Sequence, residues 1–181
     1  MISGFDVSVN TLDEIRMAVR EKKVPIHFDY HNLTLGVKDN YERFRRPVSD
    51  WRRWVFMTDT VQLNEEEIAG LTVEKSTEQQ TVGHLLTLSV KGVVVTRGER
   101  GASLFYNEHK KVVRKDIDGL NVERSRDATG CGDVFGAAFH LHYVKTRDLI
   151  AAAEFANRVA AAKAGMVGSG DIEKLKEVHR P

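Results

Sequence analysis

The sequence has one cysteine, Cys131, among its 181 residues, so the chain cannot form an internal disulfide bond. A chain without disulfides is typical of the reducing cytoplasm, and we expect a cytoplasmic protein. An excess of one charge is also missing: 27 basic and 26 acidic residues leave a net charge of +1, which does not indicate a nucleic-acid partner. No apolar run is long enough to span a membrane, and residues 1–10 lack the pattern of a signal peptide.

The composition that is present fits a globular protein, because 41% of the residues are hydrophobic and 29% are charged. The length predicts one domain, or one large piece of a domain, and we treat residues 1–181 as a single domain. No internal repeat, low-complexity segment or clear linker divides the chain.

The hydrophobic pattern predicts helices that alternate with short strands. Helices are expected at 11–23, 38–46, 64–70, 77–90, 132–146, 148–164 and 171–178. Strands are expected at 24–28, 54–57 and 92–96, with a hairpin formed by 102–106 and 110–114. The uninterrupted run from Val93 to Val95 is typical of a parallel strand that is buried on both faces. The pattern indicates an α/β fold with a mostly parallel sheet, which binds ligands at the carboxyl ends of its strands.

The stretch from Asp127 to Asp133, Asp-Ala-Thr-Gly-Cys-Gly-Asp, is the most informative segment. Its two glycines lie at a turn that opens a predicted helix, where the backbone can approach a ligand closely. The first turn of a helix has unpaired N–H groups and a partial positive charge, which suit a phosphate. A carboxylate at the same place, Asp133, would repel that phosphate. Its presence is explained if it removes a proton from a hydroxyl group that attacks the phosphate.

This stretch resembles the Asp-Thr-x-Gly-Ala-Gly-Asp signature of the ribokinase-like, or PfkB-type, carbohydrate kinases. The sequence departs from the signature at Ala128 and Cys131, which are both small. Residues 64–67, Asn-Glu-Glu-Glu, resemble the family's Asn-x-x-Glu motif. Residues 95–101, Val-Thr-Arg-Gly-Glu-Arg-Gly, resemble its Thr-x-Gly-x-x-Gly nucleotide loop. The three motifs occur in the family's order, and this makes the resemblance specific.

The resemblance implies a three-layer α/β/α fold with a mostly parallel sheet. It also implies that this chain is the C-terminal, nucleotide-binding and catalytic portion, with the N-terminal part and the lid missing, because the relatives are substantially longer. The expected cofactors are ATP and Mg²⁺, with a monovalent cation as a further candidate. The expected partner is a small-molecule sugar or related alcohol, and homodimer formation is left open.

The resemblance assigns roles to twelve residues. Asp133 would be the general base, and the backbone of Gly130, Cys131 and Gly132 would form the anion hole. The nucleotide would contact Thr96, Gly98, Gly101, Asp127, Thr129 and Asn157. Asn64 and Glu67 would organise Mg²⁺ and its waters.

Some of these residues also have a purely structural interpretation. An Asn followed three residues later by Glu is the capping-box pattern, although a cap would also fix the Glu67 carboxylate for a contact with Mg²⁺ through water. Asn157 could equally face solvent from its alanine-rich helix. The segment 29–32 resembles the family's Asp-Pro-Asn segment only loosely, so its role in binding is doubtful.

Other function classes fit less well. Cys131 at a helix N-terminus could be a nucleophile, but His140 and His142 lie about two or more turns along the helix, too far to act as its base. No Gly-x-Gly-x-x-Gly follows a first strand, so a dinucleotide-dependent oxidoreductase is disfavoured. Two hypotheses remain: an ATP-dependent sugar kinase, or a catalytically incomplete nucleotide-binding fragment that lacks the sugar site.

Overall fold

The structure is a computed structural model that describes residues 7–73, 75–122, 127–168 and 172–179. Its strands are β1 His27–Asp29, β2 Leu35–Val37, β3 Arg43–Arg45, β4 Thr60–Asn64, β5 Gly92–Thr96, β6 Gly101–Glu108 and β7 Lys111–Asp118. Its α-helices are α1 Val9–Val19, α2 Trp51–Phe56, α3 Glu65–Gly70, α4 Glu78–Thr87, α5 Cys131–Thr146 and α6 Leu149–Ala164. Two 3₁₀ helices are η1 Gly98–Arg100 and η2 Ile172–His179.

The strands form a five-stranded sheet in the order β1-β4-β5-β6-β7, and β2 pairs with β3 in a separate two-stranded sheet. The expected α/β fold is therefore confirmed. The chain divides into two compact units. Unit 1 contains Met1–Val95 and Phe105–Arg114, and unit 2 contains Thr96–Leu104 and Lys115–Pro181. Within the described ranges, no helix has the length and apolar character needed to cross a bilayer.

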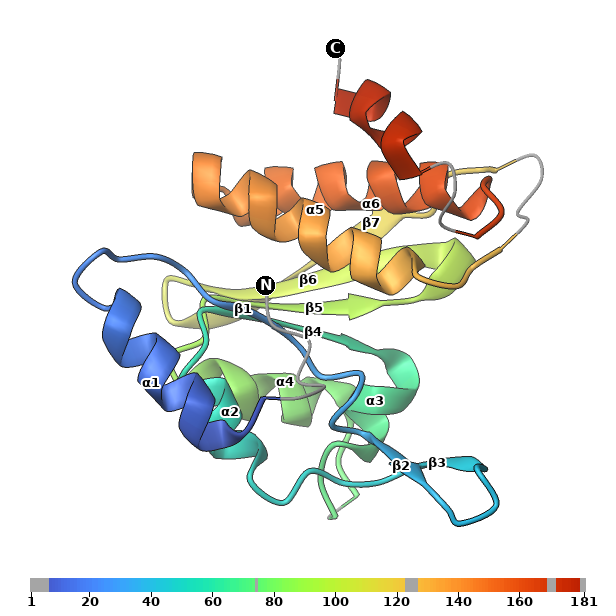
Figure 1. The fold of residues 1–181 in the computed structure, drawn as a ribbon. Helices are drawn as coiled ribbons and strands as arrows, with labels where there is room; N and C mark the ends of the chain where they lie inside the picture. The colour runs from blue at the N-terminus through green and yellow to red at the C-terminus, as the bar shows by residue number, and fades with distance from the viewer. Residues whose placement is uncertain (1–6, 74, 123–126, 169–171, 180–181) are drawn as a thin grey trace. The chain divides into compact units, whose positions relative to one another are not determined.

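The hydrophobic core of unit 1 lies between its helices and one face of strands β1, β4 and β5, which run side by side in Figure 1. Strands β1 and β4 are parallel, with Phe28 in register with Val61. The Phe28 ring packs at 4.9 Å from the Trp54 ring of α2, and both side chains are buried. Val93 and Val95 of β5 also belong to this core, while Val94 is buried outside it. The predicted strand, buried on both faces, is thus confirmed.

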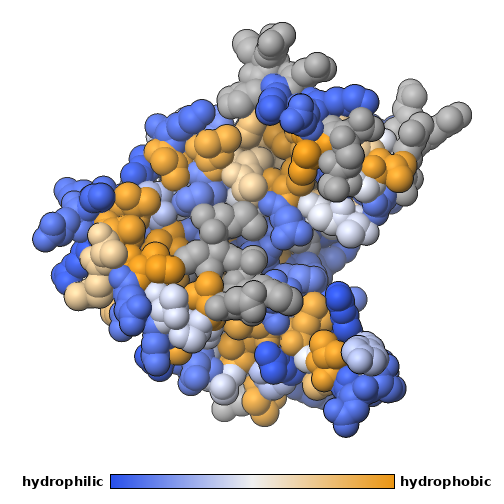
Figure 2. Space-filling view, in the orientation of Figure 1, coloured by the Kyte–Doolittle hydropathy of each residue, from blue (hydrophilic) through white to orange (hydrophobic). Residues whose placement is uncertain are grey.

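The predicted helix at 38–46 is wrong, because this segment forms the turn and second strand of the β2–β3 hairpin. Lys38 donates its backbone N–H to the carbonyl of Glu42 at 2.9 Å, and Tyr41 lies between them with φ 65°. The Asn40 side chain accepts from the backbone N–H of Glu42 at 3.1 Å. Asn side chains compete with helical hydrogen bonds in this way. The prediction relied on the charged residues of the segment and overlooked the tendency of Asn40 to form a turn. Hydrophilic and hydrophobic residues lie side by side over this hairpin in Figure 2.

The predicted strand at 54–57 is also wrong, because the chain there forms α2. Trp51, Trp54 and Val55 are buried and follow the i, i+3, i+4 spacing of a helix, whereas Phe56 is 63% exposed. The strand follows later, as β4. A short apolar run does not distinguish a strand from a buried helix. The prediction interpreted this run as a strand, although the spacing of the two tryptophans is that of a helix.

The predicted hairpin at 102–114 is confirmed, with longer strands than expected. Strands β6 and β7 are joined by His109 and Lys110, whose φ angles are 48° and 64°. Two successive positive φ angles define a type I′ turn, which matches the twist of an antiparallel hairpin. The side chain of Asn107 donates to the carbonyl of Leu86 at 3.5 Å and so connects the hairpin to α4.

In unit 2, the two long helices expected at 132–146 and 148–164 are confirmed as α5 and α6, which lie alongside each other in Figure 1. Arg147, with φ 60°, ends α5. The Asp148 side chain then caps α6 by accepting from the N–H groups of Ile150 and Ala151 at 2.9 and 3.0 Å. The expected helix at 171–178 is found as the 3₁₀ helix η2, and residue 171 lies outside the described residues.

Asp59 connects three segments of unit 1 and provides a test of the fold. Its Oδ2 accepts from Arg16 Nη2 of α1 at 2.7 Å and from the N–H of Ile26 at 2.8 Å, and its Oδ1 lies 3.3 Å from Lys91 Nζ. Burial raises the pKa of Asp59, but the hydrogen bonds from Ile26 and Arg16 and the nearby cationic charges together lower it. The native state therefore prefers the charged form, which adds stability at neutral pH and loses it as pH falls through the lowered pKa.

We expect Asp59→Ala to reduce the free energy of unfolding by about 1.5–3 kcal/mol at neutral pH, since it removes charge-assisted hydrogen bonds. Urea denaturation followed by circular dichroism measures the loss. Asp39→Ala, at an exposed position of the β2–β3 turn, is the matched control and should change stability by less than about 0.5 kcal/mol. Equal effects of the two substitutions would contradict this role of Asp59.

Candidate functional site

The glycine turn at the start of α5 has the geometry that its sequence predicts. Gly130 is the N-cap residue and has φ 78°, a left-handed conformation that favours glycine. The N–H of Cys131 donates to the carbonyl of Ala128 at 3.1 Å, and Val134 donates to the carbonyl of Gly130 at 3.0 Å. The Cys131 N–H is therefore already hydrogen-bonded within the turn. The positive end of the sixteen-residue helix lies at this point.

Asp133 lies in the first turn of α5, and its side chain is exposed. A carboxylate is favoured at this end of a helix, so the position is stable without a ligand. Exposure leaves the carboxylate accessible to a hydroxyl group. The structure thus places an acid and a helix N-terminus at one accessible position, as the sequence predicted.

Asp127 determines the shape of the loop that precedes the turn. Its Oδ1 accepts from the N–H of Thr129 at 2.9 Å, and its Oδ2 accepts from the N–H of Gly168 at 3.1 Å. The N–H of Asp127 in turn donates to the carbonyl of Ala164, at the end of α6, at 3.3 Å. The hydrogen bond from the Thr129 amide is the main cause that lowers the pKa of Asp127. Both carboxylate oxygens hold protein amides, so Asp127 links this loop to the segment after α6.

Cys131 is half-buried, and its Sγ lies 3.9 Å from the carbonyl oxygen of Asp127. Burial raises the pKa of the Cys131 thiol. A nucleophilic cysteine needs a lowered pKa, so this environment favours the interpretation of Cys131 as a small residue that packs within the turn.

The expected nucleotide loop follows β5 and contains η1. Thr96 ends the strand, and the glycines of the motif take positive φ angles, 61° at Gly98 and 91° at Gly101. The N–H of Arg97 donates to the carbonyl of Gly101 at 2.8 Å and closes the loop. The positive φ at both glycines explains why the motif requires them.

The nucleotide loop packs against a second glycine turn at the end of β7. The N–H of Gly119 donates to the carbonyl of Arg100 at 3.1 Å. A Cβ atom added to Gly119 would lie 1.8 Å from the carbonyl oxygen of Glu99, and one added to Gly101 would lie 2.1 Å from that of Ile117. The two backbones are in contact, and no larger residue fits at either glycine without moving them.

Asn157 of α6 holds this second turn in place. Its side chain is buried and donates from Nδ2 to the carbonyl of Asp118 at 2.8 Å. The sequence left open whether Asn157 faces solvent, and the structure shows that it does not. Asp118 and Gly119 were missed, although an Asp-Gly pair directly after a strand is a recognised turn signal.

In unit 1, Asn64 and Glu67 form a complete capping box at the start of α3. The N–H of Glu67 donates to Asn64 Oδ1 at 2.8 Å, and the N–H of Asn64 donates to Glu67 Oε2 at 2.7 Å. The Glu67 carboxylate is buried, and its Oε1 also accepts from His31 Nδ1 at 2.6 Å and from Arg45 Nη1 at 3.2 Å. Both carboxylate oxygens of Glu67 are thus engaged by protein groups, which disfavours direct ligation of Mg²⁺ by this side chain.

Comparison with known proteins places the chain in a family. The profile of the pfkB family carbohydrate kinases matches residues 35–175. The chain belongs to this family. The ribokinase of Bacillus subtilis (strain 168) is 33% identical over 102 residues, a match that covers 52% of this chain and 33% of that protein.

Solved ribokinases have the fold of this pfkB-family chain. The ribokinase of Thermotoga maritima superimposes with a TM-score of 0.73 at 20% identity, over 98% of this chain and 55% of that one. The ribokinase of Arabidopsis thaliana, solved with ribose and ATP, gives a TM-score of 0.71 at 23% identity, over 94% of this chain and 52% of that one. The chain thus spans about half the length of these solved relatives. The expected ribokinase-like fold is confirmed.

Two residues of this pfkB-family chain that contact Glu67 were missed in the sequence. His31 lies in the segment 29–32, whose likeness to the family is loose, and Arg45 lies in the segment predicted as a helix. The Asp29 carboxylate orients this region, because its Oδ1 accepts from the N–H of His31 at 3.0 Å and its Oδ2 accepts from Gln62 Nε2 at 3.1 Å. Across the residues that the structure describes, no group of three or more His, Cys, Asp or Glu side chains is arranged to hold a metal ion.

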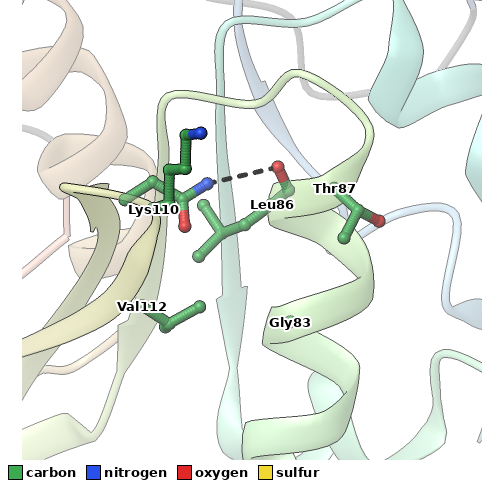
Figure 3. A pocket seen from close by; sticks show the side chains of 6 residues that line it. Gly83, Leu86, Thr87, Lys110 and Val112 are labelled. Atoms are coloured by element: carbon green, nitrogen blue, oxygen red, sulfur yellow. Dashed lines mark hydrogen bonds between the residues drawn. The ribbon is translucent and has the colours of Figure 1, made fainter.

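A surface groove of about 450 Å³ lies in unit 1 between α4 and the β6–β7 hairpin (Figure 3). The residues that line it are Gly83, Leu86, Thr87, Asn107, Lys110 and Val112. None of them belongs to the three motifs. The groove is therefore separate from the residues that the sequence assigns to nucleotide and phosphate.

Proposed function

We propose that this pfkB-family chain is the nucleotide-binding and catalytic portion of a kinase that transfers the γ-phosphate of ATP to an alcohol group of a sugar. One observation carries the proposal: the left-handed Gly130 opens a sixteen-residue helix whose first turn exposes the Asp133 carboxylate. A helix N-terminus binds phosphate, and a carboxylate beside it can remove the proton of the attacking hydroxyl.

The reaction follows from this placement. Asp133 accepts the proton of the sugar hydroxyl, and the hydroxyl oxygen forms a bond to the γ-phosphorus. The bond between the γ-phosphorus and the β–γ bridging oxygen breaks, and ADP leaves. Because the start of α5 between Gly130 and Asp133 is already oriented, its dipole can stabilise the transferred group without rearrangement.

The remaining residues bind and orient. Thr96, Gly98 and Gly101 form the loop proposed to contact the nucleotide, and Asn157 supports that loop through the turn at 118–119. Asp127 and Thr129 shape the loop that leads to the anion site. Asn64 with Glu67 would hold one of the waters of Mg²⁺, which when bound would supply positive charge to the β- and γ-phosphates.

A second candidate function is a nucleotide-binding portion that has no activity of its own. The observation that favours it is the length of the chain, which covers only 55% and 52% of the two solved ribokinases. Alignment of the acceptor with the phosphate accounts for up to about 7–11 kcal/mol of a bimolecular barrier. A chain that lacks the acceptor pocket loses that contribution and turns over slowly or not at all.

Isothermal titration calorimetry with the magnesium complexes of ATP and ADP, with pyrophosphate as a separate arm, tests the proposal. We expect both nucleotides to bind. An assay of ADP formation with a panel of aldoses, ketoses and polyols then separates the two candidates. Binding with turnover supports the kinase, and binding without turnover supports the second candidate. No binding of either nucleotide would contradict both.

A further inference from the structure

Lys163, the second-last residue of α6, has an unusual environment. Its side chain is only 3% exposed, and within the described part of the chain its Nζ has no hydrogen-bond partner. A buried ammonium group without a partner is costly, so lysine is almost never fully buried unless it is paired. Such a buried, unpaired group needs an explanation, and a negatively charged ligand that pairs with the ammonium group would provide one.

The position of Lys163 is at the loop that leads to the anion site. Ala164, the next residue, accepts the N–H of Asp127 at 3.3 Å, and Gly168 donates to the Asp127 carboxylate at 3.1 Å. The positive charge of Lys163 also acts on two side chains of this segment. It helps to lower the pKa of Asp127, and it opposes the rise that burial causes in the pKa of Cys131. Lys163 is therefore placed at this segment first by the hydrogen bond between Asp127 and its neighbour Ala164, with which the effect of its charge agrees.

Stabilisation of a helix C-terminus does not explain this burial. A cation in the last turn of a helix is favourable, but an exposed side chain provides the same effect. Lys145 in the last turn of α5 has that ordinary arrangement, because its side chain is exposed. Lys163 instead gives up its water, and the helix dipole alone does not offset that loss.

We propose that Lys163 is a fixed cation of the phosphate-binding turn, so that this turn needs no added monovalent cation. The contacts of Asp127 support this proposal: both of its carboxylate oxygens already accept protein amides, and a further cation at this loop would be repelled by the Lys163 ammonium group. Lys163 acts as a positioning residue that raises the positive potential at the turn. The proposal rests on the proposed function, because it requires a phosphate group to bind there.

The test measures the dissociation constant of the magnesium complex of ADP by calorimetry, using the chain and three variants. We expect Lys163→Met to weaken binding about 10- to 100-fold, because the turn loses a positive charge that favours the phosphate. Lys163→Arg keeps the charge and should restore most of the affinity. Lys145→Met removes one exposed charge from the same unit and should leave the affinity unchanged.

A second measurement needs no variant. The affinity of the unaltered chain for the same ligand is compared in tetramethylammonium chloride and in potassium chloride at equal concentration. We expect no change between the two salts, and a tenfold gain in potassium would overturn the proposal. This comparison decides the matter if thermal melts show that Lys163→Met does not fold.

The outcomes separate the two proposals. If the unaltered chain binds ADP and a folded Lys163→Met variant binds it equally well, the role of Lys163 is wrong and the proposed function stands. If the unaltered chain binds no nucleotide, both are wrong.

Discussion

Replacing Asp133 with asparagine should lower kcat for sugar phosphorylation by about 10²- to 10⁴-fold, the range typical of a lost general base. Asparagine keeps the size of the side chain and the hydrogen bonds of the α5 start, but it cannot accept the proton of the sugar hydroxyl. The dissociation constant of the nucleotide should change little, because the turn at Gly130 remains. Steady-state ADP formation measures kcat, and calorimetry measures the nucleotide affinity.

The matched control for this experiment is Glu154→Gln, which removes one exposed acidic charge from α6 of the same unit. It should leave kcat within about twofold, as expected for a surface substitution away from the site. If Asp133→Asn retains near-normal turnover, the assignment of the base is wrong. A loss of affinity together with turnover would instead indicate that Asp133 organises the turn.

Substituting alanine for Gly119 should destabilise the protein by about 3 kcal/mol, at the upper end of the usual cost of overpacking. The new Cβ would lie 1.8 Å from the Glu99 carbonyl oxygen, and both atoms belong to backbone that cannot turn away as a side chain can. Gly101→Ala should act in the same direction, since its φ of 91° also disfavours a side chain. Because Glu99 lies in the proposed nucleotide loop, each substitution should also weaken ATP binding.

Gly83→Ala in α4 is the matched control, because a Cβ there would meet nothing within 4 Å. Alanine is the better helix former, and this variant should gain about 0.5–1 kcal/mol. Urea denaturation gives the stability of all three variants. A Gly119→Ala variant as stable as the original chain would show that the two turns separate easily, and their proposed role in supporting the nucleotide loop would then fail.

The features that were predicted correctly depend on residues close together in the sequence. The Val93–Val95 run located the strand that was predicted at 92–96, and the Gly130 turn predicted the start of α5. Asn64 and Glu67 are three residues apart, so the capping box could be read directly. In each of these cases the hydrogen bonds or buried faces involve neighbouring residues.

The features that were missed depend on partners that are distant in the sequence. His31 and Arg45 reach Glu67 across 36 and 22 positions, and Asn157 reaches Asp118 across 39. Nothing near Lys163 in the sequence distinguishes it from an ordinary lysine at a helix end, because only the packing of the fold shows that it is buried. The local spacing of Trp51 and Trp54 did carry a helical signal, so the error there was one of interpretation.

The β2–β3 hairpin of unit 1 has ion pairs of two kinds, one within the hairpin and one that joins it to α3. Near its tip, Lys38 and Glu42 form a pair at 3.0 Å with side chains that are 51% and 58% exposed. At its base, Arg45 contacts the Glu67 carboxylate, which is only 2% exposed. Dissolved ions screen charges in contact with solvent much more than buried ones. High ionic strength should therefore loosen the tip of the hairpin while its base stays attached beside His31.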